Sequence, residues 1–508
     1  MSHLPVLPIL VPLFAGALIL LVERRGLLPQ RIVSWLSMLA LVAVAALLVA
    51  RADQGPLTVY LLGDWPARLG IALMVDRVNA LLVLTTSLLA VASLLYACAG
   101  WDRRALHFHA LFQLQLAGLN GAFLTGDLFN LFVFFEVMLI ASYGLLLSGG
   151  RGPRMRAGLH YVVFNIMAST LFLIALGLLY GMTGTLNMAE MALRIGAAAP
   201  PDVALIRAAS GILLVVFCAK AALLPLYLWL PETYSRAPAA VVALFAVMTK
   251  VGVYAVLRVY VLVFGQASGA LAGWAWDWLL PAGVATLVLA SLGALAGRTL
   301  RGTVSYLVIA SAATLFIGFA LQTPAAVSAG LYYLVHSTFV TAALFLIADL
   351  VRRQRGATGD RLERPAPMGA RTLLGVLFLI GAVSVAGLPP LSGFVGKLML
   401  LAAAPAPLTA SVWTAILATS LMMVVALSRV GSQVFWRAGR YPERDAPPQP
   451  TRIETAAAML LIGYGVALAL AAGPVLRYTQ AAGEQILAPA QYIEQVRATE
   501  PRLRAPSP

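Results

Sequence analysis

The sequence contains only three lysines, and each of them lies inside an apolar stretch: Lys220, Lys250 and Lys397. Arginine keeps its proton in proteins, whereas a buried lysine loses it readily, so a position that must load and release a proton can be Lys but not Arg. A GC-rich genome that replaces Lys by Arg would explain why lysine is rare in the loops. It would not explain why all the exceptions are apolar positions. We therefore interpret the three lysines as proton-carrying groups within a membrane.

Two of these lysines stand beside prolines that interrupt apolar runs. Pro225 follows Lys220, and Pro389 and Pro390 precede Lys397. Because proline has no N–H, it leaves the carbonyl four residues earlier without its helical partner. Broken helices of this kind form ion sites at the centre of many transporters. We expect a helix break beside each of these two lysines.

One acid and one histidine are expected at similar depth. Glu136 follows Asp127 by nine residues, which places it near the middle of its segment. A lone carboxylate there requires a partner, and we predict Lys220. The alternative is a static Glu136–Lys220 pair that joins two helices. His336 is either a hydrogen-bonded core residue or a proton relay. Asp76 and Asp127 begin their segments and should cap them.

The composition is that of a polytopic helical membrane protein. Of 508 residues, 61% are hydrophobic and 11% charged, and the mean hydropathy is +0.90. A span takes roughly 20 apolar residues. The sequence contains about fourteen such segments, near 4–22, 31–50, 76–98, 106–125, 127–148, 157–181, 205–230, 238–264, 275–297, 302–320, 324–351, 372–400, 409–436 and 453–475.

The net charge of +15 comes from arginines in the short connections between these segments. If each connection takes the number of the segment before it, the odd-numbered connections hold most of these arginines. The positive-inside rule then places the odd connections in the cytoplasm and both termini outside. The arginine-rich connection 352–371 should be cytoplasmic. This distribution explains the charge better than binding to nucleic acid does.

The remaining organisation follows from the same segments. The chain divides into 1–105, with three helices and an outer β-hairpin; 106–264 and 275–437, each a five-helix repeat; and 453–508, with the last helix and a tail. Since five is an odd number, the second repeat would be inverted relative to the first. Each repeat contains one broken helix. In the tail we expect an interfacial helix near 484–498, followed by Pro-rich disorder.

Several kinds of chemistry have no support in the sequence. Cys98 and Cys218 lie far apart in apolar runs, which suits neither a disulfide framework nor a metal site. His107, His109 and His160 lie near segment ends and receive no role. No motif for redox or nucleotide chemistry is present, so we expect no cofactor and no enzymatic activity. A membrane enzyme and a static scaffold are the remaining alternatives, and no loop carries a catalytic cluster.

Four stretches resemble a known family: GDLFNLFVFFEVMLIASYGLL, KAALLPLYLWLPETYSRAPAAVVALFAVMTKVGVYAVLR, LVHSTFVTAALFL and GLPPLSGFVGKL. They are similar to the proton-conducting subunits shared by Mrp-type cation/proton antiporters and respiratory complex I. The forms FNLFVFFE and MTKVGVYAVLR are most similar to the D subunits of the Mrp antiporters, also called Mnh or Pha.

This resemblance implies a fold, a function and roles for five residues. Glu136 and Lys220 would form a coupled pair, Lys250 a central relay, His336 the polar group of the eleventh helix, and Lys397 the last titratable group, where some relatives carry Glu. The fold would have fourteen helices with two inverted repeats. The protein would be one subunit of a hetero-oligomeric Na⁺ or K⁺/proton antiporter in the bacterial inner membrane. A redox-driven pump subunit of complex I or of a membrane hydrogenase is the alternative.

Overall fold

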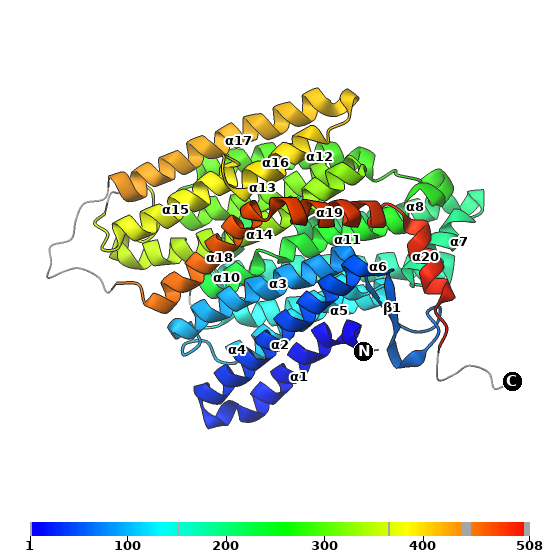
Figure 1. Ribbon diagram of the computed structural model, residues 1–508, viewed down its shortest axis with the longest axis horizontal. Helices are drawn as coiled ribbons and strands as arrows, with labels where there is room; N and C mark the ends of the chain where they lie inside the picture. The colour runs from blue at the N-terminus through cyan, green and yellow to red at the C-terminus, as the bar shows by residue number, and fades with distance from the viewer. Residues whose placement is uncertain (1–2, 151, 364–365, 438–448, 502–508) are drawn as a thin grey trace.

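The computed structural model describes residues 3–150, 152–363, 366–437 and 449–501, which form a nearly all-helical protein (Figure 1). Within these residues, twelve helices are long and apolar enough to cross a membrane. Two further predicted segments are occupied by α4, of 17 residues, and by the short pair α15 and α16. The predicted polytopic all-helical fold is confirmed. The inverted repeats and the domain boundaries remain predictions.

The helices follow the apolar segments closely. The first half of the chain forms α1 (Leu7–Val22), α2 (Leu27–Gln54), α3 (Arg77–Tyr96), α4 (Phe108–Leu124), α5 (Leu128–Leu147), α6 (Pro153–Thr183), α7 (Met188–Gly196), α8 (Pro200–Ala221), α9 (Trp229–Arg236), α10 (Ala239–Phe245) and α11 (Met248–Leu262). The second half forms α12 (Trp276–Ala296), α13 (Leu300–Ala320), α14 (Pro324–Gln354), α15 (Arg371–Ala386), α16 (Ser392–Ala402), α17 (Thr409–Gly431), α18 (Arg452–Leu470), α19 (Ala472–Ile486) and α20 (Pro489–Ala498).

The connection between α2 and α3 contains a two-stranded antiparallel hairpin, β1 (Thr58–Leu61) and β2 (Ala72–Val75). The acids that follow or precede such loops cap helices, as predicted. Asp76 accepts a hydrogen bond from the backbone N–H of Asn79 at 2.9 Å and forms a reciprocal capping box with it. Asp127 accepts from the backbone N–H of Asn130 at 2.8 Å. Both helices therefore begin at the predicted acids.

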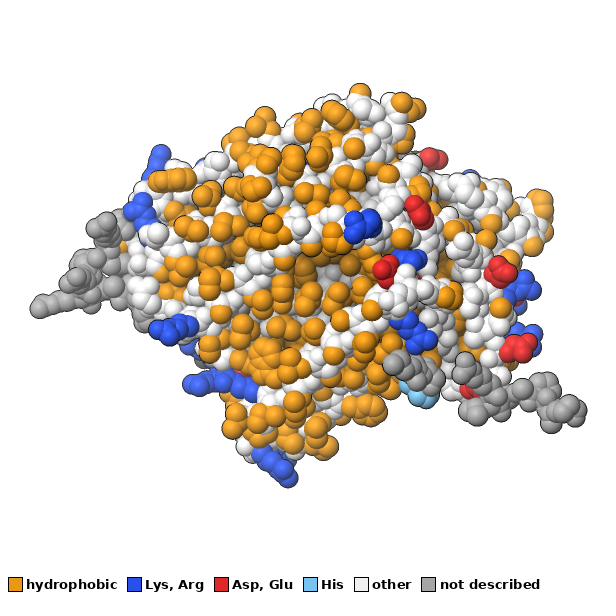
Figure 2. All heavy atoms as spheres, in the orientation of Figure 1, with side chains coloured by type: hydrophobic (Ala, Val, Ile, Leu, Met, Phe, Trp, Pro, Cys, Tyr) orange, Lys and Arg blue, Asp and Glu red, His pale blue; other side chains and the backbone are white. Residues whose placement is uncertain are grey.

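The two ends of the molecule differ in the connections that they gather. A single pocket at one end is lined by residues from the odd-numbered connections or their flanking helix ends, among them Arg104, Arg154 and Arg353. The hairpin, α7 and α20 lie at the opposite end, near both described termini (Figure 1). On the face that Figure 2 shows, acidic side chains gather only at this second end, and a band of hydrophobic side chains separates the two ends. Odd and even connections therefore lie on opposite sides.

The tail differs from its prediction. The last membrane segment continues beyond residue 475 as α19, which packs against α14 and α3. The helix predicted over 484–498 is wrong at its start, because Ile486 still belongs to α19 and a new helix begins at Pro489. Proline is suited to the first turn of a helix and unsuited to its interior, so the chain breaks there. α20 then contacts α7 and β1. The disorder predicted at 502–508 and residues 364–365 of the arginine-rich connection lie outside the described residues.

Candidate functional site

Glu136 and Lys220 are linked through a serine that the sequence did not suggest. The carboxylate of Glu136, on α5, accepts a hydrogen bond from the Ser169 hydroxyl, on α6. Lys220, on α8, donates to the same hydroxyl at 3.5 Å, and its Nζ lies 5.3 Å from the centre of the Phe135 ring. Among the described residues these two charged groups form no direct ion pair. Ser169 is therefore the contact through which they interact.

The helix break beside Lys220 lies where Pro225 predicts it. α8 ends at Ala221, and Ala222 adopts a left-handed conformation with φ of 60°. The Trp229 indole N–H reaches back from α9 to the carbonyl of Ala219 at 3.1 Å. The backbone N–H of Leu224 is held by the hydroxyl of Thr286, on α12, at 2.9 Å. The exposed backbone groups of the break are thus bound by side chains, as a membrane interior requires.

Lys250 also lies at an interruption, which no proline marks. Residues Ala246 and Val247 separate α10 from α11, and the Phe245 carbonyl accepts instead from the Tyr234 hydroxyl at 3.0 Å. The side chain of Lys250 is fully buried. Its Nζ donates to the Ser311 hydroxyl, on α13, at 2.8 Å. All three lysines therefore lie next to a discontinuity in a helix.

The turns that carry Lys220 and Lys250 are packed together by a glycine. Gly252 lies so close to α8 that a Cβ on it would be 2.7 Å from the backbone nitrogen of Ala221 and 3.0 Å from the carbonyl oxygen of Phe217. Contacts this short are possible only for glycine. Gly252 thus sets the approach of α11 to the end of α8, at the residue that follows Lys220.

His336 contacts the second break directly. Its Nδ1 lies 2.9 Å from the Ser392 hydroxyl, at the first residue of α16. A Cβ on the next residue, Gly393, would be 2.9 Å from Nε2 of the same ring. The imidazole also lies within electrostatic range of both Lys250 and Lys397. His336 therefore stands between the last two lysines.

Lys397 is held by the backbone groups that the prolines free. Its Nζ donates to the carbonyls of Val385 at 3.2 Å and Ala386 at 3.0 Å, which are the positions four residues before Pro389 and Pro390. It also donates to the Ser420 hydroxyl, on α17, at 2.9 Å. The break at the end of α15 thus creates the acceptors that hold a buried ammonium group.

Sequence reasoning missed two features of this region. The first is the set of hydroxyls that contact the titratable groups: Ser169, Ser311, Ser392 and Ser420. The second is a buried ion pair between Arg258 and Asp76, which joins α11 to the cap of α3. An arginine within the apolar run 238–264 should have signalled it, because an intramembrane charge needs a partner.

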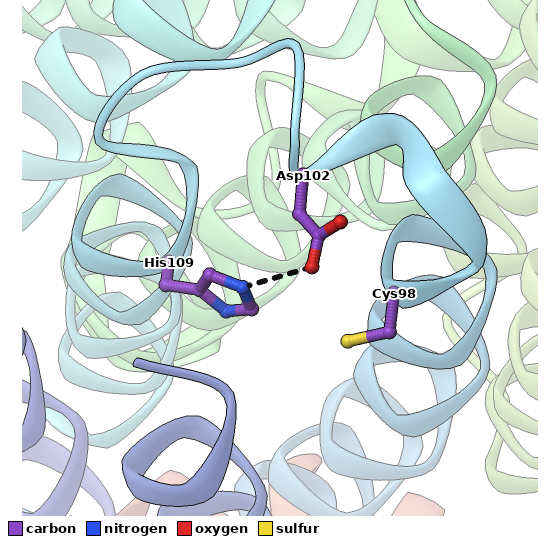
Figure 3. A group of neighbouring side chains, drawn as sticks. All are labelled: Cys98, Asp102 and His109. Carbon is purple, nitrogen blue, oxygen red and sulfur yellow. Dashed lines mark hydrogen bonds and ion pairs between the residues drawn. The ribbon is translucent and has the colours of Figure 1, made fainter. Parts of the chain in front are cut away.

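Cys98, Asp102 and His109 meet at the end of α3, with possible metal-ligand atoms within 4.8 Å of one another (Figure 3). The group does not suit a metal, because the Arg31 guanidinium already binds both oxygens of Asp102, at 2.7 and 2.9 Å. Nδ1 of His109 also lies 2.9 Å from the Ser34 hydroxyl. Burial opposes ionisation of Asp102, but its hydrogen bonds to His109 and Arg31 prevail and lower its pKa to about 2. The cluster fastens α2, α3 and α4 together.

Comparison with known proteins assigns the family. The family model described as "NADH:quinone oxidoreductase/Mrp antiporter, TM" matches residues 125–425. Among relatives named as antiporter D subunits, that of a probable K(+)/H(+) antiporter of Rhizobium meliloti is 40% identical, covering 98% of both chains. That of a Na(+)/H(+) antiporter of Alkalihalophilus pseudofirmus is 36% identical, covering 98% of this chain and 99% of the relative. The solved structure of the Mrp complex from Dietzia sp. contains a chain that is 27% identical, with a TM-score of 0.88; the match covers 98% of this chain and 100% of that one. The chain therefore belongs to the NADH:quinone oxidoreductase/Mrp antiporter family of transmembrane proteins.

Proposed function

We propose that this chain is the proton-translocating subunit of a multi-subunit Na⁺ or K⁺/proton antiporter in the bacterial cytoplasmic membrane. The observation that supports it best is the series of buried titratable groups, each with a serine hydroxyl in contact: Glu136, Lys220, Lys250, His336 and Lys397. The relatives named as antiporter D subunits support the exchange of a monovalent cation for protons. Other subunits would complete the cation pathway.

Protons would move along this series by changes in electrostatic partnership. Glu136 stabilises the charged form of Lys220 through Ser169. Loss of that support leaves a buried cation without its counter-ion, which favours release of its proton toward Lys250. The close contact at Gly252 brings the two lysine-bearing turns together. His336 and Lys397 would continue the path to the second break, with water bridging the gaps at Pro225 and Pro389.

The alternative is a redox-driven pump subunit, since the family description also names NADH:quinone oxidoreductase. It would use the same residues with a different energy source. The two functions differ in their gene neighbours: small antiporter subunits in one case, and redox subunits in the other. Cation-dependent proton exchange without added electron donors distinguishes them in vesicles.

The replacement Lys220→Arg is the test of this proposal. Arginine keeps the positive charge and binds carboxylate and hydroxyl groups well, but it does not release its proton. We expect an assembled complex with antiport reduced at least a hundredfold. The measurement is Na⁺- or K⁺-dependent proton release from everted vesicles, normalised to the amount of assembled complex. Wild-type exchange in this variant would contradict a proton-carrying role for Lys220 and favour a static scaffold.

A further inference from the structure

The odd-numbered connections meet around a pocket of about 170 Å³ that the proton path does not include. Its walls come from the ends of α3 and α14, the beginnings of α6, α10, α13 and α18, and the connection after α3. Five arginines line it: Arg104, Arg154, Arg301, Arg352 and Arg353. We name it the arginine pocket. Its position at the junction of so many elements makes its occupancy a structural matter for the whole end of the molecule.

The acids of the arginine pocket are already bound. Asp349 accepts from Arg352 at 2.8 Å and from the Tyr96 hydroxyl at 2.9 Å, and it also pairs with Arg353. Glu454 pairs with Arg353 at 2.6 Å and accepts the capping N–H of Thr451 at 2.9 Å. These two carboxylates therefore have no capacity left for the other arginines of the pocket.

The remaining arginines leave an excess of positive charge. Arg301 is paired with Asp360 outside the pocket lining. Arg154 donates to the carbonyls of Arg236 at 3.0 Å and Ser148 at 3.1 Å and stacks on Trp101, so its contacts are neutral. Among the described residues, neither Arg104 nor Arg154 forms an ion pair. Arg154 also lies within electrostatic range of Arg301 and Arg352, which repel it.

The positive-inside rule explains arginines at this end of the molecule, but it does not require that they surround a cavity. Arginines that only face lipid headgroups or water would be spread over the surface. Here Arg154 is half-buried and the Arg301 side chain is 16% exposed, and both line the same concave site. Guanidinium groups that converge on one cavity form the geometry that binds phosphate oxygens through paired N–H donors.

We propose that the arginine pocket binds a phosphate-class oxyanion, either free phosphate or the phosphate of an anionic lipid headgroup. The bound anion offsets the charge of Arg104 and Arg154 and connects α6 to the connection after α3. It also joins both to the arginines at the end of α14. It thereby braces the entry to α10, which leads to Lys250.

The experiment measures binding of radiolabelled inorganic phosphate to the purified complex by equilibrium dialysis. The complex is held in phosphatidylcholine nanodiscs, with chloride maintaining constant ionic strength. We expect saturable binding at one site per copy of this chain. The replacements Arg104→Gln and Arg154→Gln should each raise the Kd at least tenfold. The replacement Arg103→Gln removes the same charge from the same connection but lies outside the pocket lining, so it should leave the Kd unchanged.

Two further measurements keep the result interpretable. Arg154→Lys retains the charge and should weaken binding less than Arg154→Gln, while size-exclusion chromatography checks that each variant is assembled. In nanodiscs that contain phosphatidylglycerol, loss of phosphate binding together with lipid that co-purifies with wild type but not with Arg154→Gln identifies a headgroup as the occupant. Unchanged phosphate binding identifies the free anion. Absence of saturable binding to wild type, or equal binding by Arg103→Gln and the two pocket variants, overturns the proposal.

Discussion

Ser169 is the residue on which the coupling of Glu136 and Lys220 depends, since its hydroxyl contacts both side chains. We expect Ser169→Ala to lower cation-dependent proton exchange by roughly tenfold or more, because a hydrogen bond to a charged group is worth about 1.5–3 kcal/mol. Ser169→Thr keeps a hydroxyl and should retain most of the activity. Exchange is measured in everted vesicles at equal amounts of assembled complex.

The adjacent Thr170 provides the control for this prediction. Its hydroxyl bonds the Ile166 carbonyl of its own helix at 3.0 Å and points away from the site. Thr170→Ala should therefore behave as wild type. Equal loss of exchange in the Ser169→Ala and Thr170→Ala variants would mean that α6 is sensitive to any lost hydroxyl, and the link through Ser169 would lose its support.

Titratable groups could be predicted from the sequence because they are rare in apolar stretches, and each one needs a reason to be there. Hydroxyls could not, because a serine or threonine within a helix usually satisfies itself on its own backbone. Thr85, Thr86 and Ser87 do so in α3. Nothing in the sequence separates Ser169 from these residues. Only the packing of α6 against α5 and α8 does.

Gly252 controls the distance between the helices that carry Lys220 and Lys250. A methyl group at this position would overlap the backbone of α8 at Ala221, which has no side-chain rotamer to move aside. We expect Gly252→Ala to lower the yield of assembled complex or, where it assembles, to reduce exchange severalfold, because overpacking costs about 1–3 kcal/mol. Assembly is measured by size-exclusion chromatography and exchange in vesicles.

Gly177 gives the matched control, because a Cβ there would meet nothing within 4 Å in this chain. Replacing a glycine by alanine in a helix interior stabilises the helix by about 0.5–1 kcal/mol where space allows. Gly177→Ala should assemble at least as well as wild type. If both replacements were harmless, the contact between α8 and α11 would be looser than the structure indicates.

The helix breaks show which structural features a sequence can reveal. Pro225 and the pair Pro389–Pro390 mark two of the three discontinuities, since proline cannot make the missing hydrogen bond. The third, at Ala246–Val247, has no such mark. It depends on the Tyr234 hydroxyl, which takes the Phe245 carbonyl and which lies on a different helix. A discontinuity held by a distant partner is a tertiary feature.

Asp127 offers a test through pH, because it lies outside the span of α5 that it caps. Burial raises its pKa to about 6, although hydrogen bonds from the backbone oppose this. Above pH 6 the charged form is buried in the folded state, which costs stability. As the pH falls through 6, the folded state takes up a proton that the unfolded state does not bind until near pH 4. Wild type should therefore gain stability over this range.

We expect Asp127→Asn to remove this dependence. The amide oxygen can still accept the Asn130 N–H, and the buried charge is gone. The variant should be more stable than wild type at pH 8 by roughly 1 kcal/mol, given that the side chain is partly exposed, and equal to it near pH 4. The measurement is the Tm of the detergent-solubilised complex. The exposed acid Asp53 serves as control, and a pH-independent difference for Asp127→Asn would contradict the argument.

At the scale of the whole molecule, the distribution of arginines predicted which connections share a side. The arginine pocket gathers residues from connections far apart in the sequence, such as Arg104 and Arg353, so the alternation of segments is correct. One missed helix would have placed these residues at opposite ends. The ion pair of Arg258 with Asp76 could not be predicted in the same way, because it depends on how α11 packs against α3.

The side of the membrane that each end faces is tested by cysteine labelling. Ala357, in the arginine-rich connection, and Ala199, before α8, are both exposed and lie at opposite ends of the chain's fold. In a background with Cys98 and Cys218 replaced by alanine, we expect an impermeant thiol reagent to label Ala199→Cys in intact cells and Ala357→Cys only in everted vesicles. Reversed labelling would keep the fold and invert its orientation, which would place the arginine pocket outside the cell. Labelling of both positions from the same side would contradict the alternation of the helices themselves, since α8 through α14 separate the two residues by an odd number of crossings.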